Sequence, residues 1–229
     1  MPLIQTVLFD LDGTLVDPAV GITHSIQQAL SKLGQPVLPQ ADLLQYIGPP
    51  LRQSFATLLR TTDSTLVERA MTLYRERYAT VGLLENDLYP GIPALLAQLH
   101  KQPLQLFLAT AKPHVYARRI LAHIGLESYF AGIYGSELDG RHENKGDLLA
   151  YLLATEQLDA AATVMVGDRE HDIRAARQNG LRSIGVTYGY GSVEELQAAG
   201  ADVLCERVAG VAAAINVINS TVPEFSSTS

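Results

Sequence analysis

The sequence predicts an α/β fold in which a doubly wound parallel sheet carries a small helical domain inserted after its first strand. Two observations support this prediction. Short, continuous apolar runs alternate with stretches of helical periodicity along most of the chain, which is typical of parallel strands buried on both faces. The stretch from Pro18 to Leu83 breaks this alternation, because it contains only helix-like patterns.

Each predicted strand ends at a polar or glycine-containing turn. The five apolar runs are Leu3–Phe9, Leu104–Ala109, Thr163–Val166, Ser183–Val186 and Ala201–Leu204. The helical patterns between them are Ile92–His100, Val115–Ile124, Lys145–Thr155, Ile173–Asn179 and Val193–Ala199. This order of elements predicts a Rossmann-like core.

The inserted stretch reads as a helical cap over the carboxyl edge of the sheet. Its helical patterns are Ile22–Leu33, Ala41–Tyr46, Leu51–Leu59 and Leu66–Tyr78, separated by glycine and proline. The predicted core therefore comprises residues 1–16 and 84–219, and the predicted cap domain comprises residues 17–83. The borders of the cap are the expected hinges, and the polar residues 220–229 are expected to form a loose tail.

The composition narrows the class of protein. The chain has 229 residues, of which 47% are hydrophobic and 18% are charged, and its formal net charge is -7. These values are ordinary for a globular protein and argue against nucleic acid or an anionic membrane as the main partner. A small anionic substrate remains compatible, since one bound cation and a few local donors can reverse the field in a pocket.

The N-terminal and cysteine patterns indicate the expected location. The chain enters an apolar strand without a basic segment, and no apolar run approaches the roughly 18 residues of a membrane span. Cys205 is the single cysteine, so no intrachain disulfide can form. We expect a cytoplasmic protein, and the sequence does not predict its oligomeric state.

Polar side chains gather at the predicted strand ends, where ligands bind in open α/β sheets. In chain order they are Asp10, Asp12, Thr110, Lys112, Lys145, Asp168 and Asp172. Such acids, a hydroxyl and amines suit a site for a divalent cation and a phosphoryl group. Magnesium prefers hard oxygen ligands, and Asp10 and Asp168 can supply carboxylates from neighbouring strands.

The same residues can divide the work of phosphoryl transfer. A metal-bound carboxylate can attack phosphorus to form an aspartyl-phosphate, and another acid can protonate the leaving oxygen and later accept a proton from water. Thr110 can donate to a phosphoryl oxygen, and Lys145 can offset the gathered negative charge. Gly13 and Gly167 would let the backbone approach the ligand closely.

Each residue also has an ordinary interpretation when taken alone. Acids after strands are common in turns, Thr110 can be a helix cap, and Lys145 can be a solvated lysine. Asp172 can cap its helix or position Lys145, so it is assigned a supporting role. The order of all candidates at successive strand ends favours a common site.

The run Phe9-Asp-Leu-Asp-Gly-Thr-Leu-Val-Asp17 resembles the first motif of the haloacid dehalogenase-like hydrolase superfamily. Thr110 matches its second motif, Lys145 its third, and the segment Gly167–Asp172 its fourth. The inserted helices resemble the helical cap of that family. The resemblance implies Asp10 as nucleophile, Asp12 as acid/base, and Mg²⁺ held by Asp10, Asp168 and the backbone carbonyl of Asp12.

The resemblance is strongest to the phosphoglycolate phosphatase-like branch, through the segments Ile47–Leu51 and Tyr89–Ile92. Members that dehalogenate lack the acid at the position of Asp12, and Lys32 has no obvious partners for the Schiff-base chemistry of phosphonate-cleaving members. The implied function is a magnesium-dependent phosphatase for a small phosphorylated metabolite. A 5'-nucleotidase or another phosphomonoesterase of the family is the alternative.

The segment Gly48–Arg52 is expected to face the active site, with Arg52 binding the non-reacting anionic end of the substrate and Lys112 also contacting substrate. A solvated position for Arg52 is equally compatible with the sequence.

Two functional classes other than a phosphatase stay open. One is a phospho-accepting regulatory protein, which would stop after one phosphoryl group per chain, and the other is a non-catalytic phosphate-binding protein on the same scaffold.

Overall fold

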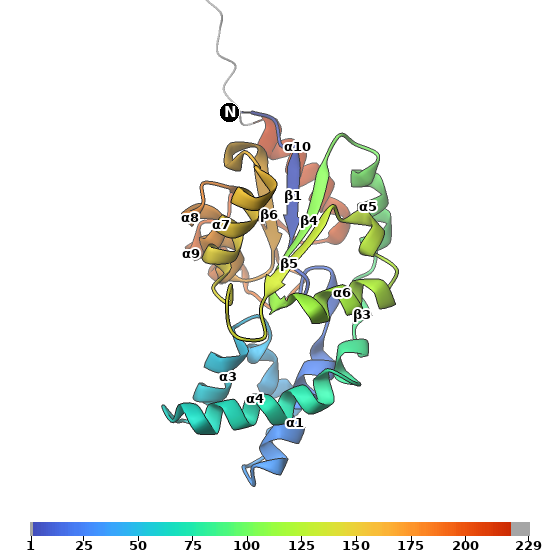
Figure 1. The fold of residues 1–229 in the computed structure, drawn as a ribbon. Coiled ribbons are helices and arrows are strands. Elements are labelled where there is room, and N and C mark those ends of the chain that lie inside the picture. Colours follow the sequence, from blue (N-terminus) through green and yellow to red (C-terminus); the bar gives the residue numbers. More distant parts are fainter. Residues whose placement is uncertain (1, 221–229) are drawn as a thin grey trace, which may run out of the picture.

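The computed structural model describes residues 2–220, and its centre is a six-stranded parallel sheet. Along the sheet the strands are β5 (Gly132–Ser136), β4 (Gln105–Pro113), β1 (Thr6–Phe9), β6 (Thr163–Gly167), β7 (Arg182–Val186) and β8 (Val203–Cys205). Every neighbouring pair is parallel. The predicted doubly wound α/β fold is therefore confirmed (Figure 1).

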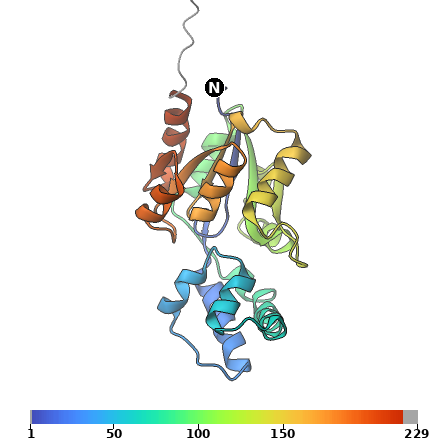
Figure 2. The ribbon, with the colours of Figure 1, turned by 90° about the vertical axis from the view of Figure 1, so that its left-hand side faces the viewer.

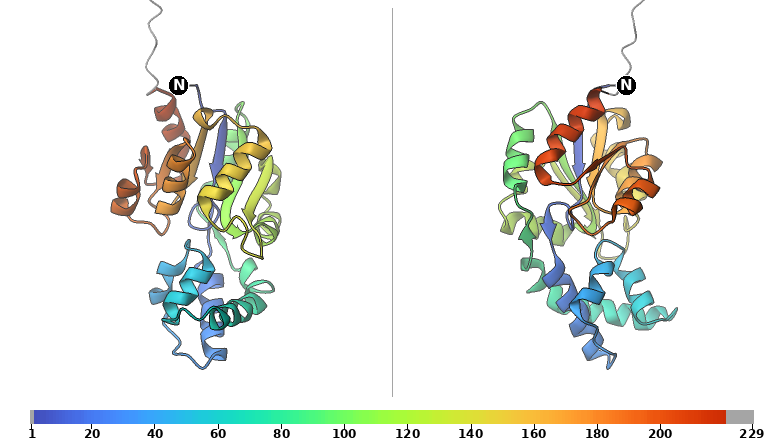
Figure 3. Two further views of the ribbon diagram at one scale, coloured as in Figure 1. Left: turned by 60° about the vertical axis from the view of Figure 1, so that its left-hand side comes forward. Right: turned by 180° about the vertical axis from the view of Figure 1, so that it is seen from behind.

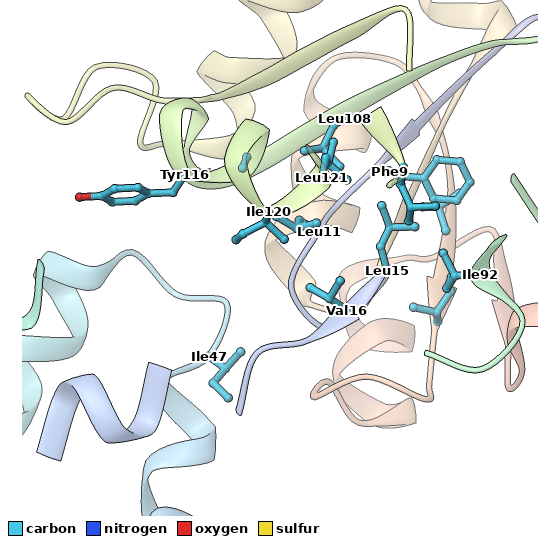
Figure 4. Packing of buried hydrophobic residues seen from close by; sticks show 14 of the residues in the cluster. Phe9, Leu11, Leu15, Val16, Ile47, Ile92, Leu108, Tyr116, Ile120 and Leu121 are labelled. Carbon is cyan, nitrogen blue, oxygen red and sulfur yellow. The ribbon is translucent and has the colours of Figure 1, made fainter. Parts of the chain in front are cut away.

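Alternate residues of the central strands face opposite sides of the sheet, as strand geometry requires. On β1, Val7 and Phe9 belong to the large apolar cluster, whereas Leu8 belongs to the smaller cluster on the other face. Phe107 and Leu108 of β4 divide between the same two clusters. Figure 4 shows part of the large cluster beside β1, β4 and the helix that follows β4.

Helices cover both faces of the sheet. In chain order they are α5 (Ile92–His100), α6 (His114–His123), α7 (Lys145–Glu156), α8 (Glu170–Gln178), α9 (Val193–Ala199) and α10 (Val211–Ser220). Side chains of α5, α6 and α10 pack in the large cluster, and those of α7 and α8 pack in the smaller one. Figure 3 shows α7 in front of the sheet from one side and α10 in front of it from behind.

Several elements were not predicted from the sequence, and the longest of them are strand β5 and helix α10. The edge strand β5 contains two glycines and no continuous apolar run, so it lacks the usual strand signal. The helix α10 combines alanines, which favour a helix, with valine, isoleucine and asparagine, which are weak helix formers, and its apolar face is buried. Short 3₁₀ turns complete the core at η3 (Glu127–Tyr129), η4 (Ala160–Ala162) and η5 (Val208–Gly210).

The inserted stretch is helical, as predicted, and lies beyond the carboxyl ends of the strands (Figures 1 and 2). Its elements are α1 (Ala19–Lys32), α2 (Gln40–Leu43), η1 (Leu44–Tyr46), α3 (Leu51–Leu58), α4 (Ser64–Tyr78) and η2 (Gly82–Leu84). The two segments that join this insert to the core pair with each other as antiparallel strands, β2 (Val16–Asp17) and β3 (Asp87–Leu88). The division into a core domain and a cap domain stays a prediction.

The ends of the described chain add two facts. The predicted tail at 220–229 lies outside the described residues, apart from Ser220, which ends α10. Among residues 2–220, no helix combines the length and the apolar character that crossing a membrane requires. The cytoplasmic location stays a prediction.

Candidate active site

The central strands bring the predicted residues together at one edge of the sheet. Asp10 directly follows β1, and Asp168 directly follows β6, which pairs with β1. Thr110 lies near the end of β4, on the other side of β1. All three side chains are buried. The topology thus brings Asp10, Asp168 and Thr110 together from three adjacent strands.

Lys145 is the first residue of α7 and joins two of the acids. Its Nζ donates to Asp10 Oδ1 at 2.7 Å and lies 2.8 Å from Asp172 Oδ1. Burial works against the charged form of the lysine, but the carboxylates of Asp10 and Asp172 raise the pKa of Lys145. The lysine is therefore a fixed positive charge that holds one oxygen of Asp10.

Three carboxylates form the group best suited to a metal ion. One oxygen each from Asp10, Asp168 and Asp172 lies within 4.8 Å of the others, and all three residues are buried. Burial, followed by the charges of Asp172 and Asp10, raises the pKa of Asp168 well above its usual range. A divalent cation would supply the missing positive charge, and carboxylate oxygens are ligands that it accepts. The residues present therefore fit such an ion.

Both oxygens of Asp172 have protein partners, and one of these partners is Lys145. Oδ1 pairs with Lys145, and Oδ2 accepts a hydrogen bond from the backbone N–H of Arg169 at 3.1 Å, which caps α8. These contacts are the two that the sequence suggested for a supporting residue. Its role stays a prediction.

Asp168 is held by residues to which the sequence analysis assigned no role. Thr14 Oγ1 donates to Asp168 Oδ1 at 3.3 Å, and the backbone N–H of Tyr190 donates to Oδ2 at 2.8 Å. A Cβ atom on Gly189 would lie 2.3 Å from the carbonyl oxygen of Gly13 and 2.4 Å from Asp168 Cβ. The loop after β7 therefore closes over the acid, and only its glycine content hinted at such packing.

The glycines of the motifs pack closely against the acids Asp168 and Asp172. Gly13 has a φ of +80°, and an added Cβ would lie 2.1 Å from Asp168 Oδ2. A Cβ on Gly167 would lie 2.3 Å from Asp172 Cγ. Packing within the protein thus leaves no room for a side chain at either glycine, and the close approach of their backbone to a ligand stays a prediction.

Asp12 points to a different partner from Asp10. Its Oδ2 lies 2.8 Å from Lys112 Nζ, and the same amine contacts the hydroxyl of Tyr78 from α4. Asp12 Oδ1 is buried and has no hydrogen-bond partner among the described residues. Burial raises the pKa of Asp12, although the charge of Lys112 opposes the shift. The side chain of Asp12 therefore lies outside the carboxylate group, and its predicted carbonyl ligand stays a prediction.

Thr110 adjoins this pair through an irregularity in β4. The strand was predicted to end at Ala109, but it continues to Pro113 with a shift of register between Thr110 and Pro113. The backbone N–H of Lys112 donates to Thr110 Oγ1 at 3.2 Å. This bond leaves the hydroxyl proton of Thr110 available for a ligand.

A cavity of about 360 Å³ lies between this edge and the helical insert. Asp10, Asp12, Thr110, Lys112 and Lys145 line its core side. Apolar and aromatic residues form much of its remaining wall, among them Tyr46, Pro49, Pro50, Met71, Tyr74, Tyr78 and Tyr116. Pro49 and Pro50 belong to the segment Gly48–Arg52 that was expected to face the site. The tyrosines and Met71 could not be assigned from the sequence, because they carry no recognisable motif.

Arg52 also lines the cavity, as the sequence suggested for Gly48–Arg52. Its guanidinium pairs with Glu68 of α4, and both side chains are nearly half exposed. The structure thus brings Arg52 to the cavity wall and gives it a protein partner there. Binding of substrate by Arg52 stays a prediction.

The family model described as haloacid dehalogenase-like hydrolase matches residues 7–186 of the chain. A 5'-nucleotidase from Pseudomonas aeruginosa is 46% identical over 192 residues, which cover 84% of this chain and 86% of that protein. A phosphoglycolate phosphatase from Vibrio parahaemolyticus is 30% identical, with 89% of this chain and 92% of that protein covered. The tyrosine-protein kinase PtkA of Mycobacterium tuberculosis is 41% identical over 191 residues, which cover 83% of this chain and 64% of the kinase.

The arrangement of the elements also has a solved counterpart. The crystal structure of a predicted phosphatase from Clostridium acetobutylicum superposes with a TM-score of 0.91 at 40% identity. The match covers 94% of this chain and 100% of the other. The sheet and the helical insert therefore recur together in that protein.

Proposed function

This chain belongs to the haloacid dehalogenase-like hydrolase family and is a phosphatase, and we propose that it cleaves a small phosphomonoester through a phosphorylated Asp10. The observation that carries the proposal is the separate support of two acids at one cavity. Asp10 is tied to Lys145, whereas Asp12 is tied to Lys112. Lys145 thus orients Asp10 as a nucleophile. Asp12 Oδ1 has no hydrogen-bond partner among the described residues, so this oxygen is available to exchange a proton.

The proposed reaction has two steps. In the first, an Asp10 oxygen bonds to phosphorus, the bond from phosphorus to the leaving oxygen breaks, and Asp12 gives its proton to that oxygen. In the second, water attacks phosphorus, Asp12 takes a proton from the water, and the bond to Asp10 breaks to release phosphate. The raised pKa of Asp12, caused mainly by burial, supports its role as the proton donor in the first step.

We propose that Asp10, Asp168 and the backbone carbonyl of Asp12 would hold Mg²⁺. When bound, this ion supplies positive charge that stabilises the phosphoryl oxygens. Thr110 is proposed to donate its hydroxyl proton to one of those oxygens, and Lys145 is proposed to orient Asp10 by holding its Oδ1. These roles follow the donor arrangement and the family resemblance.

The leaving group is proposed to carry a ring. The cavity wall opposite Asp10 is rich in tyrosine and proline, and its volume of about 360 Å³ falls within the range of about 300–1,000 Å³ that is typical for drug-sized ligands. Three arginines on the wall pair with carboxylates: Arg52 with Glu68, Arg174 with Glu170 and Arg169 with Glu195. Arg75, also on the wall, donates to the carbonyl oxygen of Leu138 at 3.4 Å. An aromatic wall suits a nucleoside monophosphate better than phosphoglycolate, whose leaving group carries no ring.

The direct test is phosphate release from a panel of phosphomonoesters with Mg²⁺, with the Asp10→Asn variant assayed in parallel. The panel includes nucleoside monophosphates, phosphoglycolate, sugar phosphates and phosphotyrosine. We expect many turnovers, loss of activity in the variant and under chelation, and preference for the nucleotides. Faster hydrolysis of phosphoglycolate than of every nucleotide would overturn the proposed leaving group but leave the phosphatase assignment intact.

A different outcome would favour the phospho-accepting class. Uptake of about one phosphoryl group per chain without further release is the result expected of such a protein, and the kinase named among the relatives makes the measurement worthwhile. Turnover beyond one phosphate per chain excludes this alternative.

A further inference from the structure

The loop between η1 and α3 forms part of the cavity wall and has few hydrogen-bond donors of its own. This cap loop comprises residues 47–50, with the sequence Ile-Gly-Pro-Pro. Gly48, Pro49 and Pro50 line the cavity. Because the two prolines have no backbone N–H, the loop depends on outside contacts for its placement.

Arg169 makes such a contact from the core. Its guanidinium NH1 donates to the carbonyl oxygen of Ile47 at 2.6 Å, and its Nε donates to Glu195 Oε1 at 2.8 Å. The arginine and Glu195 are both largely buried, with side-chain exposures of 15% and 23%. One residue next to Asp168 thus connects helix α9 with the cap loop.

Two local features fit this arrangement. Gly48 has a φ of +102°, and an added Cβ would lie 3.0 Å from Arg169 Cγ and 3.3 Å from its NH1. Glu195 Oε1 also accepts a hydrogen bond from the backbone N–H of Glu170 at 2.9 Å, so the carboxylate that orients Arg169 is itself fixed. The loop and the arginine are therefore packed against each other at close range.

We propose that Arg169 is a positioning residue for the reaction, because it holds the cap loop in the place where it can contact the leaving group of the substrate. The inference rests on the proposed function and extends it, since it assigns selectivity for the leaving group to a core residue beside the metal-binding edge. Arg169 does not take part in proton or phosphoryl transfer. Its effect is on the shape of the cavity wall.

Arg119 provides a matched control. It belongs to α6 of the core and donates from NH1 to the carbonyl oxygen of Ala79 in the segment after α4, at 2.9 Å. The bond is of the same type as that of Arg169 and also joins the core to the insert, but Arg119 does not line the cavity. Removing it tests the general effect of losing one such contact.

The experiment compares the full-length Arg169→Ala, Arg169→Lys and Arg119→Ala variants with the unchanged protein. Steady-state kinetics use adenosine monophosphate and methyl phosphate, whose leaving group is too small to reach the cap loop. A hydrogen bond from a charged donor corresponds to about 10- to 100-fold in binding, so we expect Arg169→Ala to raise KM for the nucleotide by about tenfold or more. In the same variant, the fold-loss in kcat/KM for methyl phosphate is expected to be at least about tenfold smaller than the fold-loss for the nucleotide.

Lysine cannot reproduce the fork of donors that reaches both Glu195 and Ile47, so Arg169→Lys should recover only part of the nucleotide KM. Arg119→Ala should affect the two esters equally. Equal losses for both esters in Arg169→Ala, or the same selectivity loss in Arg119→Ala, would overturn the proposal.

Hydrogen exchange at the backbone amides of residues 46–53 gives a readout that does not depend on turnover. Exchange in this segment should be faster in Arg169→Ala and intermediate in Arg169→Lys, and it should match the unchanged protein in Arg119→Ala. Unaltered exchange in Arg169→Ala would refute the loop-holding role. Inactivity of the unchanged protein on both esters, with faster exchange in Arg169→Ala, would instead locate the error in the proposed function.

Discussion

The two walls of the cavity are built on different physical principles. On the core side, Asp10, Lys145 and Asp172 are buried charges that hold one another at distances of 2.7 and 2.8 Å. On the side of the insert, the wall is mainly aromatic and proline-rich, and Arg52 pairs with Glu68 near the surface. The difference supports the proposal that the sheet edge performs the chemistry and that the insert selects the leaving group.

This contrast also has consequences for stability. A buried ion pair that loses one partner leaves an uncompensated charge, whereas an exposed pair contributes little. Changes at the core wall should therefore affect activity and folding together. Changes at the insert wall should affect the choice of substrate more than folding.

The largest effect is expected for Lys145→Met at the core wall. This change removes the only positive charge that contacts both Asp10 and Asp172 among the described residues. Loss of one member of a buried network costs about 3–5 kcal/mol, and we expect kcat to fall by about 10²-fold or more, within the reach of a lost electrostatic contact. Chemical unfolding and phosphate release measure the two effects, with Lys145→Arg as the control that keeps the charge. A Lys145→Met protein of full activity would break the contrast between the walls.

A smaller effect is expected for Thr14→Val, which removes the hydroxyl that donates to Asp168 Oδ1. Groups that orient metal ligands typically change metal affinity by about 10- to 100-fold, and the long bond of 3.3 Å points to the lower end. Calorimetric titration with Mg²⁺ measures the affinity. Thr14→Ser keeps the hydroxyl and should bind Mg²⁺ nearly as well as the unchanged protein. Equal weakening in both variants would assign the effect to packing.

At the insert wall, Arg52→Ala should change selectivity with little effect on folding. Because Arg52 and Glu68 are nearly half exposed, their pair contributes at most about 1 kcal/mol. We expect a loss of about fivefold in kcat/KM for preferred substrates, comparable with one exposed charged contact. Glu68→Ala is the matched variant, since it breaks the same pair but leaves Arg52 available. Unchanged kcat/KM across all good substrates in Arg52→Ala would remove Arg52 from the substrate site.

The smallest effect is expected where the insert joins the core. Arg77 donates to both oxygens of Glu85 at 2.8 and 2.9 Å, and this hydrogen bonding lowers the pKa of Glu85 below its usual 4.5. A lowered carboxylate pKa adds stability above pH 4.5, and this contribution is lost as the pH falls through the folded-state pKa. Glu85→Gln should therefore reduce the free energy of unfolding by about 0.5–1 kcal/mol at pH 7. In unfolding curves from pH 7 to pH 3, the difference from the unchanged protein should shrink below pH 4.5. A constant difference would show that the ion pair is not its cause.

The same contrast explains what could be predicted from the sequence. Asp10, Thr110 and Asp168 could be predicted because each follows an apolar run that marks a strand. The carboxyl ends of parallel strands meet at one edge of the sheet, so these residues were expected to lie together. Thr14 and Tyr190 were not assigned roles, because their contacts with Asp168 depend on how two loops fold over it. Strand β5 was missed because pairing with β4 overrides its two glycines.

The insert was predictable as a set of helices with one segment, Gly48–Arg52, expected to face the active site. Helical periodicity gave the approximate bounds of α1, α3 and α4, but which face of each helix meets the core depends on tertiary packing. The contacts of Tyr78 with Lys112 and of Arg169 with Ile47 join residues far apart in the chain. No local pattern encodes such pairs.

The most direct test of the central claim is chemical trapping of the phosphorylated enzyme. The full-length protein is mixed with Mg²⁺ and a good substrate, quenched during turnover with hydroxylamine, and digested for mass spectrometry. An aspartyl-phosphate would be converted to a hydroxamate, and we expect that modification at Asp10, with none in Asp10→Asn. Multiple turnovers with no modification at Asp10, or with modification at Asp12 or Asp168 instead, would contradict the account.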